Sequence, residues 1–144
     1  MTSVPTIDFF IKSTWRNIVG YYNQVAANYD LTQASGFVLL QIDEMHGTAA
    51  TKIGPLMGIK NTSLSRMLKK MEKDDLIFRK KDETDGRLVK VFLTNKGIEK
   101  KQQTKKVVKN FNESIVSNLS QKDIDCFHKV MDAINAQIEI SKTK

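Results

Sequence analysis

The sequence has little of what stabilises secreted or membrane proteins. Among its 144 residues there is one cysteine, Cys126, so no disulfide can form within the chain. No apolar run approaches the roughly 18 residues that a membrane-spanning helix requires. The N-terminus also lacks the basic start and apolar stretch of a signal peptide. We therefore expect a cytoplasmic protein with its own hydrophobic core, no lipid anchor and no membrane partner.

Residues that commonly carry catalysis or bind metals are also scarce. The chain has two histidines, His46 and His128, and lacks a glycine-rich phosphate loop or a nucleophile turn. Cys126 and His128 stand two positions apart, so on a helix they point to different sides. We expect no enzymatic activity, no metal site and no cofactor.

Positive charge is plentiful, and its excess lies in one region. The formal net charge is +7. Residues 60–106 hold 15 Lys or Arg against 7 Asp or Glu, whereas the rest of the chain holds 8 against 9. A localised basic region favours a polyanionic partner, either double-stranded DNA or an anionic membrane surface.

Hydrophobic periodicity predicts a mainly helical chain. Apolar residues at helical spacing indicate a first helix from Ile7 to about Asn28 and a second from Leu31 to about Met45, with Thr32 as its cap. A short third helix is expected from about Thr51 to Met57. Because Pro55 removes a backbone donor inside it, this helix should be short or distorted.

The segment "NTSLSRMLKKMEKDD" carries the clearest helical pattern, and either Asn61 or Thr62 is expected to cap it. Its apolar positions follow the spacing i, i+3, i+4 and i+7, and they are Leu64, Met67, Leu68 and Met71. After it, "LIFRK" and "LVKVFLT" are rich in strand-forming residues and flank the turn-like "KDETDGR". We therefore predict an antiparallel hairpin with a charged tip.

Two further helices are expected in the C-terminal third. The first runs from about Asn95 to Leu119, and its segment 99–106, "EKKQQTKK", has no apolar residue. We expect that segment to cross solvent between two packed bodies. The last helix opens with the capping pattern "SQKD". It carries a coiled-coil-like apolar seam made of Ile124, Phe127, Met131, Ile134 and Ile138.

A short helix, the turn "GIKN" and a helix with a polar face follow one another in helix-turn-helix order. In such a unit the second helix packs through its apolar stripe while its polar side enters the major groove. We expect hydroxyl groups to bond phosphates or base edges, Arg66 to read a guanine, and lysines to meet phosphates. The candidate DNA contacts on this helix are Asn61, Thr62, Ser63, Ser65, Arg66, Lys69 and Lys70. The alternative is an ordinary solvated amphipathic helix.

The hairpin supplies a second set of candidate contacts. Arg87 stands at its tip, where it can enter a minor groove, and Lys80, Lys81 and Lys90 stand on its flanks. Asp85 is expected to hold the Arg87 guanidinium by a paired contact. The alternative is a solvated turn without a binding role.

The stretch "GIKNTSLSRMLKKMEKDDLIFRKKDETDGRLVKVFLTNKG" resembles the winged-helix core of the MarR family of bacterial transcription regulators. The resemblance includes the family's wing signature, here Asp85, Arg87, Leu93 and Thr94. It implies a DNA-binding lobe over 31–94 and dimerisation helices over 1–30 and 95–144. It further implies a homodimer on a pseudo-palindromic operator, often with repression relieved by a small ligand. Pro55 departs from the alanine- and glutamate-rich helix that is usual before the turn.

The terminal helices also suggest a dimer independently of the resemblance. Phe9 and Phe10, together with the apolar seam of the last helix, offer more apolar surface than one small lobe can cover. The alternative is packing within the same chain. Trp15 and Tyr22 are candidates for binding a small aromatic or lipophilic effector, although aromatic residues at helical spacing also occur as ordinary core.

We therefore expect a single domain over 1–144, mainly α with a small β-hairpin, with a winged helix-turn-helix and N- and C-terminal dimerisation helices. The expected function is sequence-specific regulation of transcription on double-stranded DNA, with repression favoured over activation. The rival hypothesis is a basic protein-interaction or membrane-surface module without operator specificity.

Overall fold

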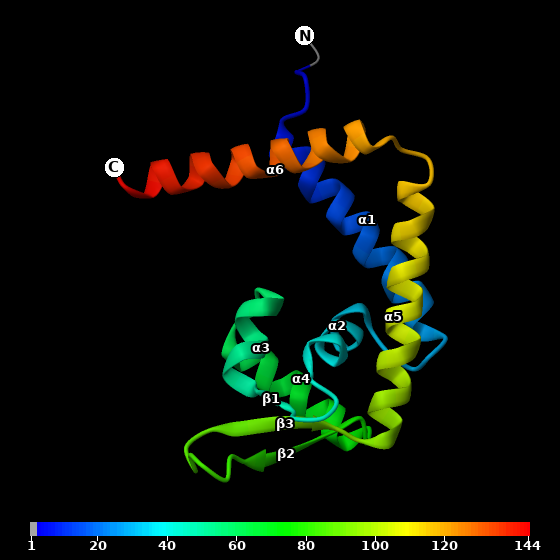
Figure 1. Ribbon diagram of the computed structural model, residues 1–144, viewed down its shortest axis with the longest axis vertical. Coiled ribbons are helices and arrows are strands. Elements are labelled where there is room, and N and C mark those ends of the chain that lie inside the picture. Colours follow the sequence, from blue (N-terminus) through cyan, green and yellow to red (C-terminus); the bar gives the residue numbers. More distant parts are fainter. Residues whose placement is uncertain (1–2) are drawn as a thin grey trace. The chain divides into compact units, whose positions relative to one another are not determined.

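The computed structural model describes residues 3–144 and consists of helices with one small antiparallel sheet (Figure 1). The chain divides into two compact units, Met1–Val107 and Val108–Lys144. The first unit contains the first four helices, the sheet and the beginning of the fifth helix, and the second contains the remainder. The predicted fold class, mainly helical with a β-hairpin, is confirmed.

Helix α1 (Ile7–Ala27) begins after Thr6 and ends one residue before the predicted boundary. Its C-terminal half packs on the second helix, where the Tyr22 ring meets Phe37 edge-on with centroids 5.7 Å apart. Tyr22 is consequently buried, and it is the buried residue of α1. The chain then turns at Asp30, which has a φ of 58°.

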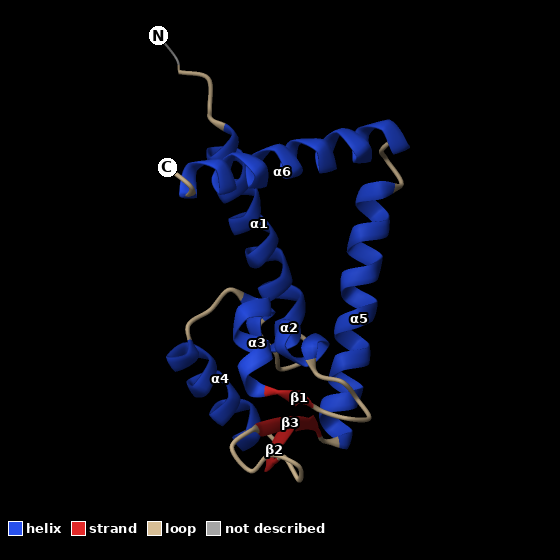
Figure 2. Cartoon of the chain, turned by 60° about the vertical axis from the view of Figure 1, so that its left-hand side comes forward, coloured by secondary structure: helices blue, strands red, loops and turns tan. Residues whose placement is uncertain are grey.

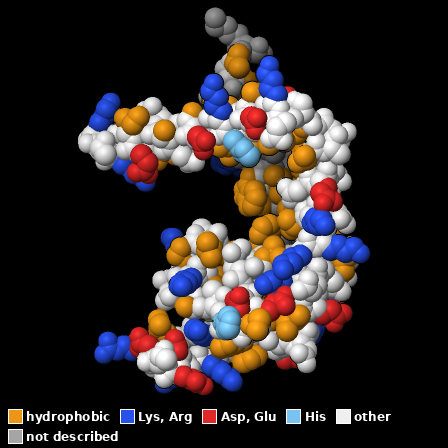
Figure 3. All heavy atoms as spheres, viewed as in Figure 1, with side chains coloured by type: hydrophobic (Ala, Val, Ile, Leu, Met, Phe, Trp, Pro, Cys, Tyr) orange, Lys and Arg blue, Asp and Glu red, His pale blue; other side chains and the backbone are white. Residues whose placement is uncertain are grey.

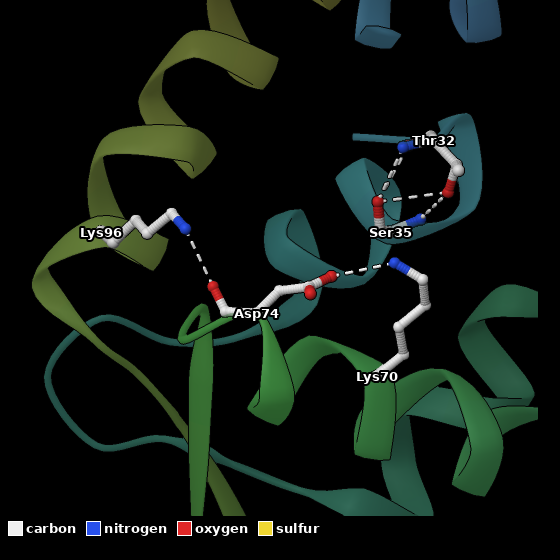
Figure 4. Close-up of polar contacts among 5 residues, drawn as sticks. All are labelled: Thr32, Ser35, Lys70, Asp74 and Lys96. Atoms are coloured by element: carbon white, nitrogen blue, oxygen red, sulfur yellow. Dashed lines mark hydrogen bonds and ion pairs between the residues drawn. The ribbon is translucent and has the colours of Figure 1, made fainter. Parts of the chain in front are cut away.

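Helix α2 (Gln33–Gln41) starts at a reciprocal capping box, which confirms Thr32 as the cap. Thr32 Oγ1 accepts the Ser35 N–H at 3.1 Å, and Ser35 Oγ accepts the Thr32 N–H at 2.9 Å (Figure 4). The predicted C-terminal end, Met45, is wrong because the backbone becomes extended at Ile42. Asp43 then organises a tight turn in which its carboxylate accepts the Met45 and His46 N–H groups.

Helix α3 (Ala50–Met57) is short and contains Pro55, as expected. It closes at Gly58, whose φ of 65° is left-handed, and the Ile59 N–H bonds back to the Gly54 carbonyl. Helix α4 (Asn61–Lys73) follows after a short turn. Its N-cap is Lys60 without a side-chain bond, so the prediction that Asn61 or Thr62 caps it is wrong.

The sheet has the strand order β1-β3-β2 (Figure 2). Strands β2 (Ile77–Lys81) and β3 (Val89–Leu93) form the predicted hairpin, with Arg79 opposite Val91 and Lys80 opposite Lys90. Strand β1 (Thr48–Ala49) pairs antiparallel with β3 and was not predicted. It is too short to show periodicity.

The core of the first unit lies between the sheet and helices α2, α3 and α4. Its largest fully buried side chains are Val38, Leu39, Ile42, Ile53, Met71 and Val91. Burying a side chain of this size contributes about 1.5–3 kcal/mol each. These contacts hold the short helices and the hairpin in one lobe.

Helix α5 (Asn95–Val116) begins directly after β3. The prediction that residues 99–106 cross solvent is wrong, because part of this segment packs on α2. Lys101 is buried, and its ammonium donates to the Ile42 carbonyl, where α2 has just ended. Thr104 lies against Gly36 of α2, where an added Cβ would be 3.3 Å from the Thr104 methyl. Long polar side chains thus pack on α2 through their stems.

Helix α6 (Gln121–Lys142) begins at Ser120, whose hydroxyl forms the expected capping box with Asp123. The Ser120 N–H and hydroxyl lower the pKa of the Asp123 carboxyl. None of its residues is buried within the chain, and Phe127 is 57% exposed. Among residues 3–144, no helix is both long enough and apolar enough to span a bilayer.

Candidate nucleic-acid interface

The outward side of α4 is a continuous polar and basic surface. Leu64, Leu68 and Met71 face the core with 2–4% of their surface exposed. The seven residues predicted to contact DNA are all exposed, and they are Asn61, Thr62, Ser63, Ser65, Arg66, Lys69 and Lys70. Four of these carry hydroxyl or amide groups and three carry positive charge. The amphipathic pattern seen in the sequence therefore places them on the free side of the helix.

Helices α3 and α4 pack against each other in the helix-turn-helix. At Gly54 of α3 an added Cβ would make ordinary van der Waals contact with α4, 3.4 Å from Asn61 Oδ1 and 3.5 Å from Leu64 Cδ2. Gly58 supplies the left-handed turn between the two helices. The left-handed backbone at Gly58 lets the chain reverse so that α4 rests on α3 with its polar side outward.

Hydrogen bonds within the β2–β3 loop give it a defined shape. The Asp82 N–H bonds to the Leu88 carbonyl at 2.8 Å, and the Leu88 N–H bonds to the Asp85 carbonyl at 3.0 Å. The Asp82 carboxylate accepts the Thr84 N–H and hydroxyl, which lower the pKa of the Asp82 carboxyl. Lys90 lowers it further by its charge.

Asp85 has a different contact from the one expected. Its Oδ1 accepts the backbone N–H of Arg87 at 3.0 Å. Within residues 3–144, no ion pair joins its carboxylate to the Arg87 guanidinium. The predicted clamp on the guanidinium is therefore wrong. Asp85 holds the backbone at the tip instead, and the Arg87 side chain remains exposed.

A groove of about 280 Å³ brings the two candidate contact regions together. Asn61 and Ser65 of α4 line it on one side, and Arg79, Arg87 and Val89 of the hairpin line it on the other. Figure 2 shows α4 running beside the hairpin loop. The hydroxyl-bearing side of α4 and the arginine of the loop therefore face one open space.

Lys90 lies elsewhere in the hairpin. Successive residues of a strand point to opposite faces, and Val91 and Leu93 of β3 are buried. Lys90 and Phe92 therefore occupy the outer face, where Phe92 stacks on Phe78 with centroids 5.4 Å apart. Lys80 completes this face, with its ammonium 5.5 Å from the Phe78 ring centroid. Lys90 thus lies on the face opposite the groove.

Polar contacts that the sequence pattern does not predict tie α4 to its neighbours. Glu72 of α4 forms an ion pair with Arg79 of β2. Lys70 pairs with Asp74 at 2.9 Å, and the Asp74 carbonyl accepts the Lys96 ammonium of α5 (Figure 4). The charges were visible in the sequence, but the partners of Glu72 and Lys96 depend on how α4, β2 and α5 meet.

The predicted effector and dimer residues occupy two kinds of environment. Trp15 is 50% exposed on α1, whereas Tyr22 is buried against α2. Phe9 and Phe10 are more than half exposed, and hydrophobic side chains are visible along α1 in Figure 3. On α6, Phe127 and Ile138 are exposed, while the half-buried members of the seam are Ile124, Met131 and Ile134. These roles stay predictions.

Metal coordination has no support in the part of the chain that the structure describes. Residues 3–144 contain no cluster of three or more His, Cys, Asp or Glu side chains arranged to hold an ion. Cys126 is exposed on α6. The polar groups that line the groove, beside apolar residues such as Leu64, Leu88 and Val89, are hydroxyl, amide and guanidinium groups, which suit an anionic or hydrogen-bonding partner.

Comparison with known proteins establishes the family. The family model described as "MarR family" matches residues 31–89. The HTH-type transcriptional regulator SarZ of Staphylococcus aureus is 31% identical over 117 residues, which cover 81% of this chain and 78% of SarZ. The chain belongs to the MarR family. The matched segment spans the helix-turn-helix and most of the hairpin, which carry the groove.

Solved structures show the same fold at lower identity. The MepR structure from Staphylococcus aureus, a complex with DNA, matches with a TM-score of 0.84 at 18% identity, covering 93% of this chain and 99% of MepR. FabT of Streptococcus pneumoniae, also in complex with DNA, matches with a TM-score of 0.77 at 18% identity, covering 92% and 95%. The winged helix-turn-helix architecture inferred from the sequence is confirmed.

Proposed function

We propose that this MarR-family protein is a sequence-specific transcription regulator that binds double-stranded DNA as a homodimer. One observation carries the proposal: the exposed polar side of α4 and Arg87 of the hairpin line the same groove. The MepR and FabT structures are complexes with DNA, which supports the same partner for this fold.

The two sides of the groove suit different features of a duplex. The exposed side of helix α4 carries short hydroxyl side chains together with Arg66. Short side chains allow the helix to approach the bases closely when it enters a major groove. Arg87 stands free at the end of a loop that hydrogen bonds shape, so it can reach the adjacent minor groove. Lys69 and Lys70 on the same helix supply phosphate contacts.

The proposed homodimer rests on apolar side chains that one chain leaves uncovered. Phe9 and Phe10 of α1 are 56% and 55% exposed, and Phe127 and Ile138 of α6 are 57% and 47% exposed. Large exposed apolar patches mark association surfaces. Sedimentation velocity at micromolar concentration should give twice the 16.4 kDa chain mass, and Ile138→Glu should shift the protein toward monomer. A monomer in the unaltered protein would refute this interface.

A two-fold dimer would place its α4 helices on a pseudo-palindromic site, with half-sites about one helical turn, or 34 Å, apart. We propose repression, relieved by a small aromatic or lipophilic ligand near Trp15 and Tyr22. In such a dimer the two DNA-binding lobes can stand at a separation that fits the operator or at one that does not. A ligand that binds more tightly to the second state weakens DNA binding in proportion to its difference in affinity for the two states. Trp15 is half exposed, so quenching of its fluorescence can report such a ligand.

Selection of bound fragments from the source genome tests the proposal. The full-length protein should enrich particular fragments that bind at least about 1000-fold more tightly than random duplex at the same salt concentration. Equal binding to all duplexes, with similar binding to anionic vesicles, would favour the rival basic module. Salt titration alone does not separate the two, because both weaken as ionic strength rises.

A further inference from the structure

The ion pair between Glu72 and Arg79 lies where α4 and the hairpin diverge. Residues three and four apart share a face of a helix, so Asn61, Ser65, Leu68 and Glu72 form one stripe along α4. The first three line the groove, and Glu72 continues the stripe toward the C-terminus of the helix. Arg79 lines the same groove from β2 and bonds the Glu72 carboxylate. The pair therefore joins α4 to β2 beside the groove.

The turn that joins α4 to β2 is already fixed by backbone contacts. The Thr94 N–H bonds to the Leu76 carbonyl at 3.1 Å, and the Thr94 hydroxyl bonds to the Asp75 carbonyl at 2.6 Å. Lys96 bonds the Asp74 carbonyl at 2.9 Å. These contacts hold the root of the hairpin against the start of α5, and none of them involves a residue that lines the groove.

Beyond Arg79 the hairpin has no further polar attachment to α4 among the described residues. Two more register pairs, Lys80 with Lys90 and Lys81 with Val89, lead to the loop that carries Arg87. The loop starts about 10 Å from Arg79 along the strand, so tilting the hairpin by about 10° moves Arg87 by about 2 Å. Such a shift is enough to break a hydrogen bond.

We infer that the Glu72–Arg79 pair is a positioning contact that sets the angle of the hairpin to α4 and thereby the spacing between the α4 side chains and Arg87. This inference rests on the proposed function only for its effect on DNA binding. The side chains of Arg79 and Glu72 are 30% and 34% exposed, so the pair is partly shielded from solvent. Two opposite charges joined across diverging elements restrict the angle between them, whereas the neighbouring Lys70–Asp74 pair lies within one helix and its cap.

Removing the Glu72 carboxylate distinguishes a positioning role from simple electrostatics, because the two predict opposite changes in DNA affinity. Glu72→Gln removes an acid from the basic surface, so charge alone predicts tighter DNA binding. Loss of positioning predicts weaker binding, by about tenfold, because the Arg87 contact is lost. Glu83→Gln is the matched control: it removes an exposed acid from the same hairpin without breaking an ion pair, and it should leave binding unchanged or slightly tighter.

A double-mutant cycle on a selected duplex identifies the coupling. Arg87→Ala should weaken binding by about tenfold in the otherwise unaltered protein but by less than about twofold in the Glu72→Gln background. Circular dichroism confirms that each variant is folded at the assay temperature. The inference would be overturned if Arg87→Ala weakened DNA binding by the same factor in both backgrounds, or if Glu72→Gln bound DNA more tightly than the unaltered protein.

A distance measurement tests the same inference without DNA. Spin labels at Lys69→Cys on α4 and Gly86→Cys on the loop, in a Cys126→Ser background, report the separation across the groove. Diluting labelled protein in a large excess of unlabelled protein removes distances between chains. Glu72→Gln should broaden the distance distribution, and an unchanged distribution would overturn the inference. If no duplex is selected, the proposed function fails while this measurement still decides the role of the pair.

Discussion

Gly97 gives the sharpest stability prediction, because its environment reverses the sign that helix propensity implies. It is buried in the first turn of α5, and an added Cβ would lie 1.9 Å from the Leu76 carbonyl oxygen. Real Cβ contacts are essentially never shorter than 3.0 Å, so the backbone must move by about 1 Å. The same carbonyl accepts the Thr94 N–H at 3.1 Å, and that bond would be strained or lost.

Two destabilising effects and one stabilising effect set the expected change in the free energy of unfolding for Gly97→Ala. Overpacking costs about 1–3 kcal/mol, and losing a hydrogen bond costs about 1 kcal/mol. The higher helix propensity of alanine returns up to about 1 kcal/mol. We therefore expect the free energy of unfolding to fall by about 2 kcal/mol.

Urea unfolding at a fixed protein concentration measures this change, since association would otherwise contribute to the apparent stability. Gly20→Ala is the matched control. Gly20 lies within α1 with no neighbouring atom within 4 Å of an added Cβ, so this variant should be stabilised by up to about 1 kcal/mol. If Gly97→Ala were as stable as the unaltered protein, the close contact between α5 and the α4–β2 turn would be refuted.

Three further predictions concern the DNA contacts of α4, the β2–β3 loop and the N-terminal cap of α6. Arg66→Ala should relax preference at one base pair by about 1–3 kcal/mol, whereas Lys70→Ala should weaken all duplexes alike, and equal behaviour in a binding array would contradict that division. The Asp82 carboxyl has a pKa below its ordinary value of 3.8 because the Thr84 N–H and hydroxyl bond its ionised form. The stability it contributes is present above pH 3.8 and is lost as pH falls through the lowered value, so the protection of the Thr84 amide, measured against its intrinsic exchange rate at the same pH, should fall there, and Asp82→Asn should remove that step. Ser120→Ala should cost about 1 kcal/mol of unfolding free energy by removing the α6 cap, and no change would show that the cap is dispensable.

Much of the fold was predictable because strong local patterns determine it. The stripe of Leu64, Leu68 and Met71 located α4 and showed which side of it faces outward. Thr32 and Ser120 marked helix starts because capping uses residues adjacent in sequence. The hairpin followed from two strand-forming runs around a turn.

Two of the missed features depended on contacts between segments distant in sequence, and a third on a local choice of hydrogen-bond donor. Polar residues 99–106 looked unable to pack, yet Lys101 reaches the Ile42 carbonyl at the end of α2. Strand β1 has two residues and exists only because β3 lies beside it. The Asp85 carboxylate had several donors within reach, and sequence alone does not choose the Arg87 N–H over its guanidinium.

At the candidate site, the sequence supplied candidate residues but not their arrangement. Ser65 and Arg87 were both candidates, and the groove that they share appears only when α4 and the hairpin are folded together. Lys90 was grouped with Arg87 from its position near the turn, but strand alternation places it on the opposite face of the sheet. The Glu72–Arg79 pair was not anticipated at all.

The most direct test of the account is a chemical footprint of the protein on a selected genomic duplex. Groove-specific probes should show protected guanines in the major groove of two half-sites about one helical turn apart, each flanked by a protected minor groove. In Arg87→Ala, the minor-groove protection should disappear while the major-groove protection remains. Protection that is uniform along the duplex, or minor-groove protection that persists without Arg87, would contradict the claim that α4 and the hairpin read one duplex together.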